Sequence, residues 1–120
     1  MDDIINKEYW VKKASKETVK MMEDIFKSLD EITKGYSLRY QKPSYIGIEI
    51  NSKVNNFISF RPLKRDFNKI SFRLEKTNPI DEKIKNSGIE NYTYNQKRYH
   101  LKIKESNIEL VKTLADIAKT

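Results

Sequence analysis

The spacing of apolar side chains changes at Tyr36, and this change constrains the fold more than any other feature. Before it, apolar residues recur three and four positions apart, which predicts a helix over residues 16–34, capped by Ser15 and stopped by Gly35. From Tyr36 onward apolar residues alternate with polar ones, as is typical of half-buried strands. The chain must therefore pair helices with a sheet that has one apolar face and one polar face.

Four strands are expected between residues 36 and 75, and a hairpin that turns near Asn95–Gln96 is expected later. The residues expected to face the core from these strands are Ile46, Ile48, Ile50, Ile58, Phe60, Ile70, Phe72, Leu74, Leu101 and Ile103. Helices with Phe26 and Leu114 should cover them.

Three further helices are expected outside the strands. One covers Asn6–Ala14, one begins with Asn78 as its cap and ends at Gly88, and a closing helix starts at the capping box of Ser106. These segments predict one α+β domain over residues 1–120. Its mainly antiparallel sheet has about five to six strands, with the N- and C-terminal helices packed on one face.

The composition excludes several kinds of site. The chain has no cysteine and a single histidine, His100, so disulfides, thiolate metal sites and histidine-based zinc sites lack their residues. We therefore predict no catalytic residues, no metal and no cofactor. The sequence shows no signal peptide and no apolar run long enough to cross a bilayer, which favours a cytoplasmic protein without a membrane partner.

One short motif raises the question of nuclease activity. Tyr45-Ile46-Gly47 follows Gly35-Tyr36 at about the spacing of the two tripeptides in GIY-YIG endonucleases. Such a nuclease continues through a short connection into a helix with a catalytic arginine, whereas here the alternation of a strand continues after Gly47. The motif therefore predicts a strand, in which Gly47 marks a bulge or a close backbone approach.

The chain from Tyr45 onward resembles a known family. The matching elements are the Tyr45-Ile46-Gly47 strand, a second strand from Asn56-Phe57 to Phe60-Arg61-Pro62, a basic strand with tyrosines, and the C-terminal helix. The family is a widespread bacterial domain of unknown function that is often labelled a predicted transport protein. It occurs alone or appended to nuclease-like and restriction-like proteins. The resemblance, over about residues 45–120, implies an accessory role near nucleic acid and supplies no catalytic residues.

Basic residues are concentrated in the predicted sheet. Residues 1–35 hold seven basic and eight acidic side chains, whereas residues 36–75 hold eight basic and three acidic ones, within a net charge of +7. All five arginines lie outside the predicted terminal helices, and the planar arginine fork suits phosphate recognition. This distribution favours a polyanionic partner.

We therefore predict that the polar face of the sheet binds nucleic acid, either DNA or RNA. Cations on this face would contact phosphates, an outward-facing Phe57 would stack on a base, and the loop with Lys64 and Arg65 would add charge. The predicted site consists of Arg39, Tyr45, Phe57, Arg61, Lys64, Arg65, Lys69, Arg73, Arg98, His100, Lys102 and Lys104.

Two other interpretations of the sequence remain open: a protein-interaction module and, ranked below it, an enzyme whose catalytic residues the sequence does not reveal. The polar face can be an ordinary solvated face, on which Glu49 and Glu75 pair with neighbouring bases across strands. The chain would then be a protein-interaction or oligomerisation module without nucleic-acid binding. Its apolar contact with a protein partner, or with a second copy in a homodimer, would lie around Tyr9 and Trp10.

Overall fold

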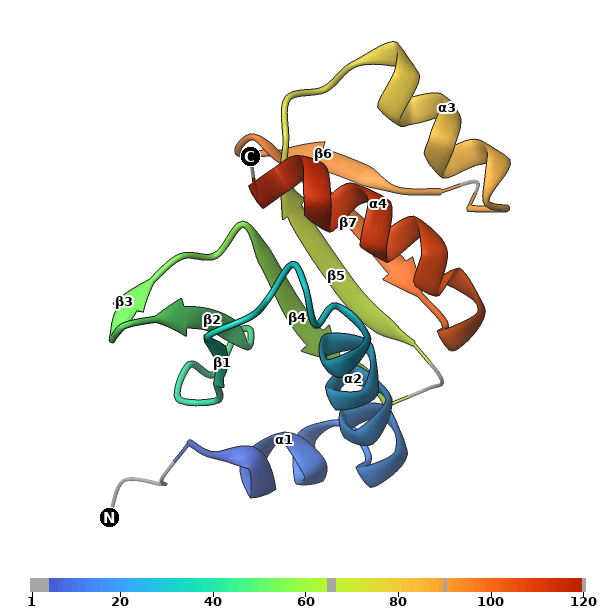
Figure 1. The fold of residues 1–120 in the computed structure, drawn as a ribbon. Coiled ribbons are helices and arrows are strands. Elements are labelled where there is room, and N and C mark those ends of the chain that lie inside the picture. Colours follow the sequence, from blue (N-terminus) through green and yellow to red (C-terminus); the bar gives the residue numbers. More distant parts are fainter. Residues whose placement is uncertain (1–4, 65–66, 90, 120) are drawn as a thin grey trace.

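The computed structural model describes residues 5–64, 67–89 and 91–119. Within these ranges the chain has an α+β fold, with helices α2 and α4 lying against strands of the larger of two sheets (Figure 1). Within the described residues, no helix is both long enough and apolar enough to cross a membrane. The elements in order are α1 (Lys7–Lys13), α2 (Lys16–Ser28), β1 (Tyr36–Arg39), β2 (Gly47–Ile50), β3 (Lys53–Val54), β4 (Ile58–Pro62), β5 (Asn68–Arg73), α3 (Asn78–Asn86), β6 (Thr93–Asn95), β7 (Arg98–Ile103), the 3-10 turn η1 (Glu105–Asn107) and α4 (Ile108–Lys119).

The strands form two antiparallel sheets instead of the single sheet predicted. The smaller sheet has the order β1-β2-β3 and the larger has the order β4-β5-β7-β6. Two backbone hydrogen bonds between Ile46 and Phe60, of 2.7 and 2.8 Å, join the sheets. Beyond them, the amide of Ile48 donates to the side-chain Oδ1 of Asn56 at 2.9 Å. A side chain thus takes the place of a strand partner, and the ladder between β2 and β4 ends there.

Gly47 provides the space for this side chain. A Cβ atom at position 47 would overlap Oδ1 of Asn56, the atom that accepts the Ile48 amide. Of the two alternatives predicted for Gly47, a bulge and a close backbone approach, the structure shows a close approach, and it is made by the Asn56 side-chain amide and not by backbone.

We expect Gly47→Ala to lower the free energy of unfolding by about 2 kcal/mol, because the new methyl group displaces the only side chain that satisfies the Ile48 amide. Urea unfolding followed by the fluorescence of the buried Trp10 would measure the loss. Asn56→Ala alone leaves the same amide unpaired, and it removes the group that the methyl would strike. The double variant should therefore cost about as much as Asn56→Ala alone, and strictly additive costs would contradict this explanation.

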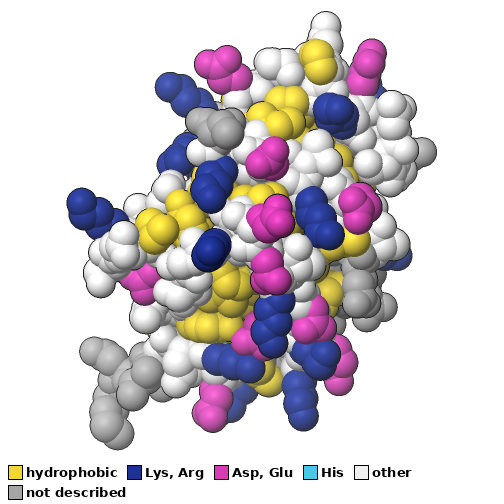
Figure 2. Space-filling model, viewed as in Figure 1, with side chains coloured by type: hydrophobic (Ala, Val, Ile, Leu, Met, Phe, Trp, Pro, Cys, Tyr) yellow, Lys and Arg dark blue, Asp and Glu magenta, His cyan; other side chains and the backbone are white. Residues whose placement is uncertain are grey.

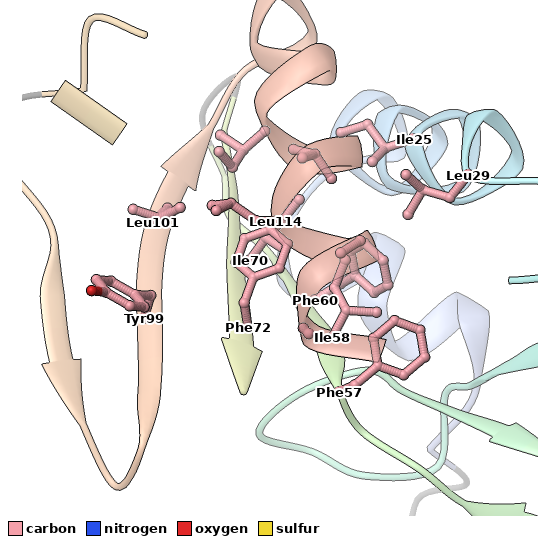
Figure 3. Packing of buried hydrophobic residues seen from close by; sticks show 14 of the residues in the cluster. Ile25, Leu29, Phe57, Ile58, Phe60, Ile70, Phe72, Tyr99, Leu101 and Leu114 are labelled. Carbon is pink, nitrogen blue, oxygen red and sulfur yellow. The ribbon is translucent and has the colours of Figure 1, made fainter. Parts of the chain in front are cut away.

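The core lies between the strands and the helices, as the alternation predicts (Figure 3). Side chains from the larger sheet meet Ile25 of α2, Leu29 directly after that helix, and Leu114 of α4. Ile50 is half-buried, and the other nine residues predicted to face the core are buried: Ile46, Ile48, Ile58, Phe60, Ile70, Phe72, Leu74, Leu101 and Ile103. Arg61 and Arg73 are exposed, so the two faces of the sheet are oriented as predicted.

Several element ends differ from the prediction. Helix α2 begins after Ser15, whose hydroxyl accepts the Thr18 amide at 3.0 Å, but it ends at Ser28, before residue 34. The Ser28 hydroxyl donates to the Ile25 carbonyl at 2.6 Å and Thr33 donates to the Leu29 carbonyl at 3.0 Å. Hydroxyls bonded to these carbonyls compete with continued helix.

The predicted caps of the last two helices also shift. Thr77, one residue before the predicted Asn78, caps α3 through a 3.4 Å bond from the Ile80 amide. Helix α4 begins at Ile108 after the 3-10 turn, in which Asn107 Oδ1 accepts the Lys104 amide at 3.1 Å. Ser106 therefore lies inside a turn and is not the start of the helix.

Two hairpin turns use consecutive non-glycine residues with positive φ. Asn51 and Ser52 connect β2 to β3, with φ of 52° and 63°, and Gln96 and Lys97 connect β6 to β7, with φ of 50° and 62°. This is the geometry of two-residue turns that match the twist of antiparallel strands. The second turn lies next to its predicted position, whereas the short strand β3 was not predicted.

Candidate anion-binding pocket

The strand register arranges the polar face of the larger sheet in rows. Arg61 of β4 lies opposite Lys69 of β5, which lies opposite Lys102 of β7. At the other end of the sheet, Arg73 lies opposite Arg98. Like charges directly opposite each other on antiparallel strands destabilise the pairing. The sheet therefore carries two cationic rows that are unfavourable for its own stability.

A row of small polar residues separates the two cationic rows. Ser59 pairs with Ser71, and Ser71 pairs with His100 on the next strand. Short side chains between long ones leave a hollow, and the structure has a pocket of about 410 Å³ at this place. The pocket is lined by Ser44, Tyr45, Asn56, Ser59, Phe60, Arg61, Lys69, Ser71, Gln96, Arg98 and His100.

Arg98 lies half-buried at the pocket without a carboxylate partner. Its guanidinium donates to the Asn56 carbonyl at 2.7 Å, to Ser59 Oγ at 3.2 Å, and to both Oγ and the carbonyl of Ser71 at 3.3 Å. An arginine carries five N–H donors, so these four bonds leave one of them free. All four acceptors are neutral, and within the described residues no ion pair involves Arg98. The guanidinium is held in place while its charge stays uncompensated.

The two serines also retain a donor. Ser59 Oγ and Ser71 Oγ are 2.7 Å apart, so one hydroxyl donates to the other. Each hydroxyl has one proton, and both oxygens already accept from Arg98. Among the described residues, no hydrogen bond provides an acceptor for the proton of the other hydroxyl. Both serines are buried, at 6% and 8% exposure, so this donor is available at the floor of the pocket.

The electrostatic environment of the pocket is positive. Burial lowers the pKa of Arg98, and the nearby charge of Arg73 lowers it further. Burial also lowers the pKa of His100 below 6.5, with smaller contributions in the same direction from Lys69 and Arg98. The neutral form of His100 is therefore favoured. Burial is the main cause of both shifts and neighbouring positive charges are the smaller one, and a bound anion would offset the repulsion between those charges.

The opposite side of the molecule has a different charge pattern. Figure 2 shows the side of α2 and α4, where Lys and Arg side chains are interspersed with Asp and Glu. The ion pairs of this layer include Lys20 with Asp24 at 3.0 Å and Lys7 with Glu23 at 3.0 Å. The pocket on the other face has no acidic residue in its lining. The unbalanced positive charge is thus a property of one face of the sheet.

Five residues of the sequence-predicted site lie together in the pocket lining: Tyr45, Arg61, Lys69, Arg98 and His100. Arg73 and Lys102 lie on the same face of the sheet, next to the pocket.

The other predicted residues are not part of this group. Phe57, expected to face outward as a stacking platform, is fully buried, and its ring meets the edge of Tyr36 at 5.5 Å. Phe57 lies just before the start of β4, so the alternation of inward and outward side chains along that strand does not extend to it. The prediction for Phe57 was wrong.

Arg39 lies on β1 of the smaller sheet and pairs with Glu49 at 3.8 Å, as in an ordinary solvated face. Lys64 is exposed in the loop after β4, Lys104 lies over the Phe67 ring, and Arg65 lies outside the described residues.

The serines, the asparagine and the glutamine of the pocket were not predicted as site residues. Ser59 and Ser71 are equally distant from the centre of the loop between β4 and β5, so a simple hairpin would have placed them opposite each other. Their equal spacing from the loop was the sequence signal that could have placed the two serines together. Ser44 and Asn56 come from connecting segments, whose positions no sequence pattern indicates. Gln96 comes from the predicted hairpin turn, but its side chain was not assigned to the site.

No family model, curated protein or solved structure matches the chain. Among the described residues, no group of three or more histidines, aspartates or glutamates is placed to hold a metal ion. The function must therefore be inferred from the pocket and the face around it.

Proposed function

We propose that the chain is a non-catalytic module that binds the phosphate backbone of nucleic acid at the polar face of its larger sheet. The resemblance of residues 45–120 to a domain found beside nucleases supports an accessory role in a nuclease or defence system. The observation that carries the proposal is the uncompensated charge of this face. Arg61, Lys69 and Arg98 line one pocket, and no carboxylate is among the lining residues.

Repulsion between the cations of this face makes a bound anion favourable. Cross-strand neighbours of like charge weaken the sheet, as at Arg61 and Lys69 or at Arg73 and Arg98. A bound polyanion turns this repulsion into attraction, and it gains entropy by releasing condensed counterions. An ordinary solvated face would place acids between such bases.

A non-catalytic role agrees with the bonding of the pocket. His100 is the only group there with an ordinary pKa near neutrality, and its Nε2 is bonded to Asn95 Oδ1 at 2.9 Å. No hydrogen bond of the described residues joins His100 to Ser59 or Ser71. A serine nucleophile would need such a base within hydrogen-bonding reach.

The alternative, a protein-interaction module, has less support. Trp10 is fully buried and donates its indole N–H to the Tyr40 carbonyl at 3.1 Å, so it cannot form the predicted contact surface. Tyr9 is half-buried against the same core. Of the large hydrophobic residues in the described part of the chain, Val54 and Ile117 are the exposed ones, at 51% and 37%. An apolar interface needs a larger patch.

A titration with nucleic acids at several salt concentrations tests the proposal. Hydroxyl-ended single-stranded DNA, single-stranded RNA and duplex DNA would each be titrated between about 50 and about 200 mM salt. We expect the logarithm of affinity to fall linearly with the logarithm of salt concentration. Arg61→Gln with Arg73→Gln should reduce the steepness of this slope by about one unit for each arginine.

The matched control is Lys12→Gln with Lys16→Gln, which removes the same charge from exposed positions in the helical layer. It should leave the slope almost unchanged. Equal losses from both pairs would show that only net charge matters. Absence of binding at the lowest salt concentration would overturn the proposal.

Binding should also depend on pH through His100. Burial, Lys69 and Arg98 lower the pKa of His100, so its neutral form is favoured and it becomes protonated as the pH falls. Affinity for hydroxyl-ended strands should therefore rise a few-fold between about pH 7.5 and about pH 5.5, and His100→Gln should remove the rise.

In the absence of nucleic acid, protonation of His100 should instead lower the stability of the fold. A lowered pKa in the folded state means that stability is lost as pH falls through it, which unfolding at each pH would measure.

A further inference from the structure

The pocket is lined by residues from several segments of the chain, and this arrangement concerns the kind of phosphate that it favours. Ser44 and Tyr45 line it beside β4, and His100 lines it on β7. Arg61 and Lys69 lie at one end, while Asn56 and Gln96 belong to the end at which Arg98 begins β7. Polar and cationic residues therefore line the hollow at both ends, which favours a compact anionic group at its centre.

The groups inside the pocket match a compact anion with more than one charge. Three cations line it, one N–H of Arg98 is unused, and one serine proton lacks an acceptor. A phosphodiester inside a strand carries one charge and continues on both sides. A phosphomonoester carries a charge of about −1.5 to −2 at neutral pH and has three free oxygens, so it can enter end-on.

From these observations we propose that the pocket is a phosphomonoester site, and that its ligand is the phosphorylated end of a nucleic-acid strand. The inference rests on the proposed function, which brings the strand to this face. Arg98 and the serines would hold the terminal phosphate at the floor, with Arg61 and Lys69 at its rim. The half-buried Tyr45 in the wall is the one tyrosine of the lining and would contact the terminal base or sugar.

The test compares strands that differ only at their ends. One single-stranded oligonucleotide would be titrated with a 5′-phosphate, with a 3′-phosphate and with hydroxyls at both ends, beside a mononucleotide and inorganic phosphate. We expect one of the phosphorylated strands to bind about tenfold more tightly than the hydroxyl-ended strand, because charge-assisted hydrogen bonds are added at the end.

Two variants assign this preference to the pocket. Ser71→Ala removes a pocket hydroxyl without changing charge, so it should bring the ratio of the two affinities close to one. Ser37→Ala, at an exposed serine of β1, is the matched control and should keep the ratio. Because Ser71 also accepts from Arg98, Lys69→Gln provides a second variant, at a side chain that makes no hydrogen bond to another described residue. It should also lower the ratio.

The outcomes separate this inference from the proposed function. Equal binding of phosphorylated and hydroxyl-ended strands would overturn the end-recognition site and leave backbone binding intact. A preference that survives both pocket variants would place the phosphate elsewhere and overturn the site. Binding of the mononucleotide or inorganic phosphate without binding of any strand would overturn the nucleic-acid source of the ligand, together with the proposed function.

Discussion

Lys69→Glu is expected to weaken binding of hydroxyl-ended strands about a hundredfold while leaving the protein as stable as before, or more stable. Lys69 lies on β5 between Arg61 and Lys102, its cross-strand neighbours on both sides. A carboxylate at this central position replaces two like-charge contacts by two attractive ones, which should add about 0.5 kcal/mol to the free energy of unfolding. The same carboxylate repels phosphate at the rim of the pocket, and it removes the counterion release of one lysine.

The control for this experiment is Lys16→Glu, a charge reversal of the same size in the first turn of α2. An acid is favourable near a helix N-terminus, so the variant should fold well. Its affinity should fall far less, because Lys16 lies in the helical layer away from the pocket. Salt-dependent titration and urea unfolding of both variants would measure the two effects. A Lys69→Glu protein that binds as the wild type does would exclude this face as the site, and a destabilised one would show that the cationic row does not weaken the sheet.

Phe60→Ala should cause a large loss of stability, of about 4 kcal/mol. The ring is fully buried and meets the edge of Phe26 from α2, with centroids 6.3 Å apart. Its backbone also forms the bridge to Ile46 that joins the two sheets. Truncation therefore leaves a cavity where the larger sheet, the smaller sheet and a helix meet. Because proteins are stable by only about 5–15 kcal/mol, such a variant would be close to unfolding.

Val54→Ala is the control for the loss of apolar side-chain volume, because Val54 is 51% exposed. Its free energy of unfolding should stay within about 0.5 kcal/mol of the wild type. If Phe60→Ala cost less than about 1 kcal/mol, the core around this ring would be loosely packed.

The alternation of side chains was sufficient to predict the two faces of the larger sheet. It placed Ile58, Phe60 and Phe72 inward and Arg61 and Arg73 outward, because a strand with one solvated face has no other way to bury its apolar half. The prediction failed at Phe57, which lies just before β4. There the chain passes between the two sheets, and Phe57 packs against Tyr36 of the smaller one.

The division into two sheets involves a single side chain, and the alternation of apolar and polar residues could not have predicted it. Asn56 accepts the Ile48 amide that a continuous sheet would have paired with β4, and Gly47 makes room for it. Hydropathy does not distinguish such an asparagine from one in a loop. The pocket was missed in part for a similar reason. The cations of the pocket could be identified in the sequence. The hollow comes from Ser59 and Ser71, which carry no charge and come together only when β4 and β5 are paired.

The junction between the sheets also determines how the molecule would open. Strand β5 is hydrogen-bonded along its length to both β4 and β7, whereas β2 meets β4 at one bridge. Amide protons of the smaller sheet should therefore exchange with solvent by local unfolding, at a lower free energy than those of β5. Ser44 and Tyr45 lead directly into β2. The wall that they form is then the least stable part of the pocket, and its opening would widen the entrance for a bulky strand end while the cationic floor stays folded.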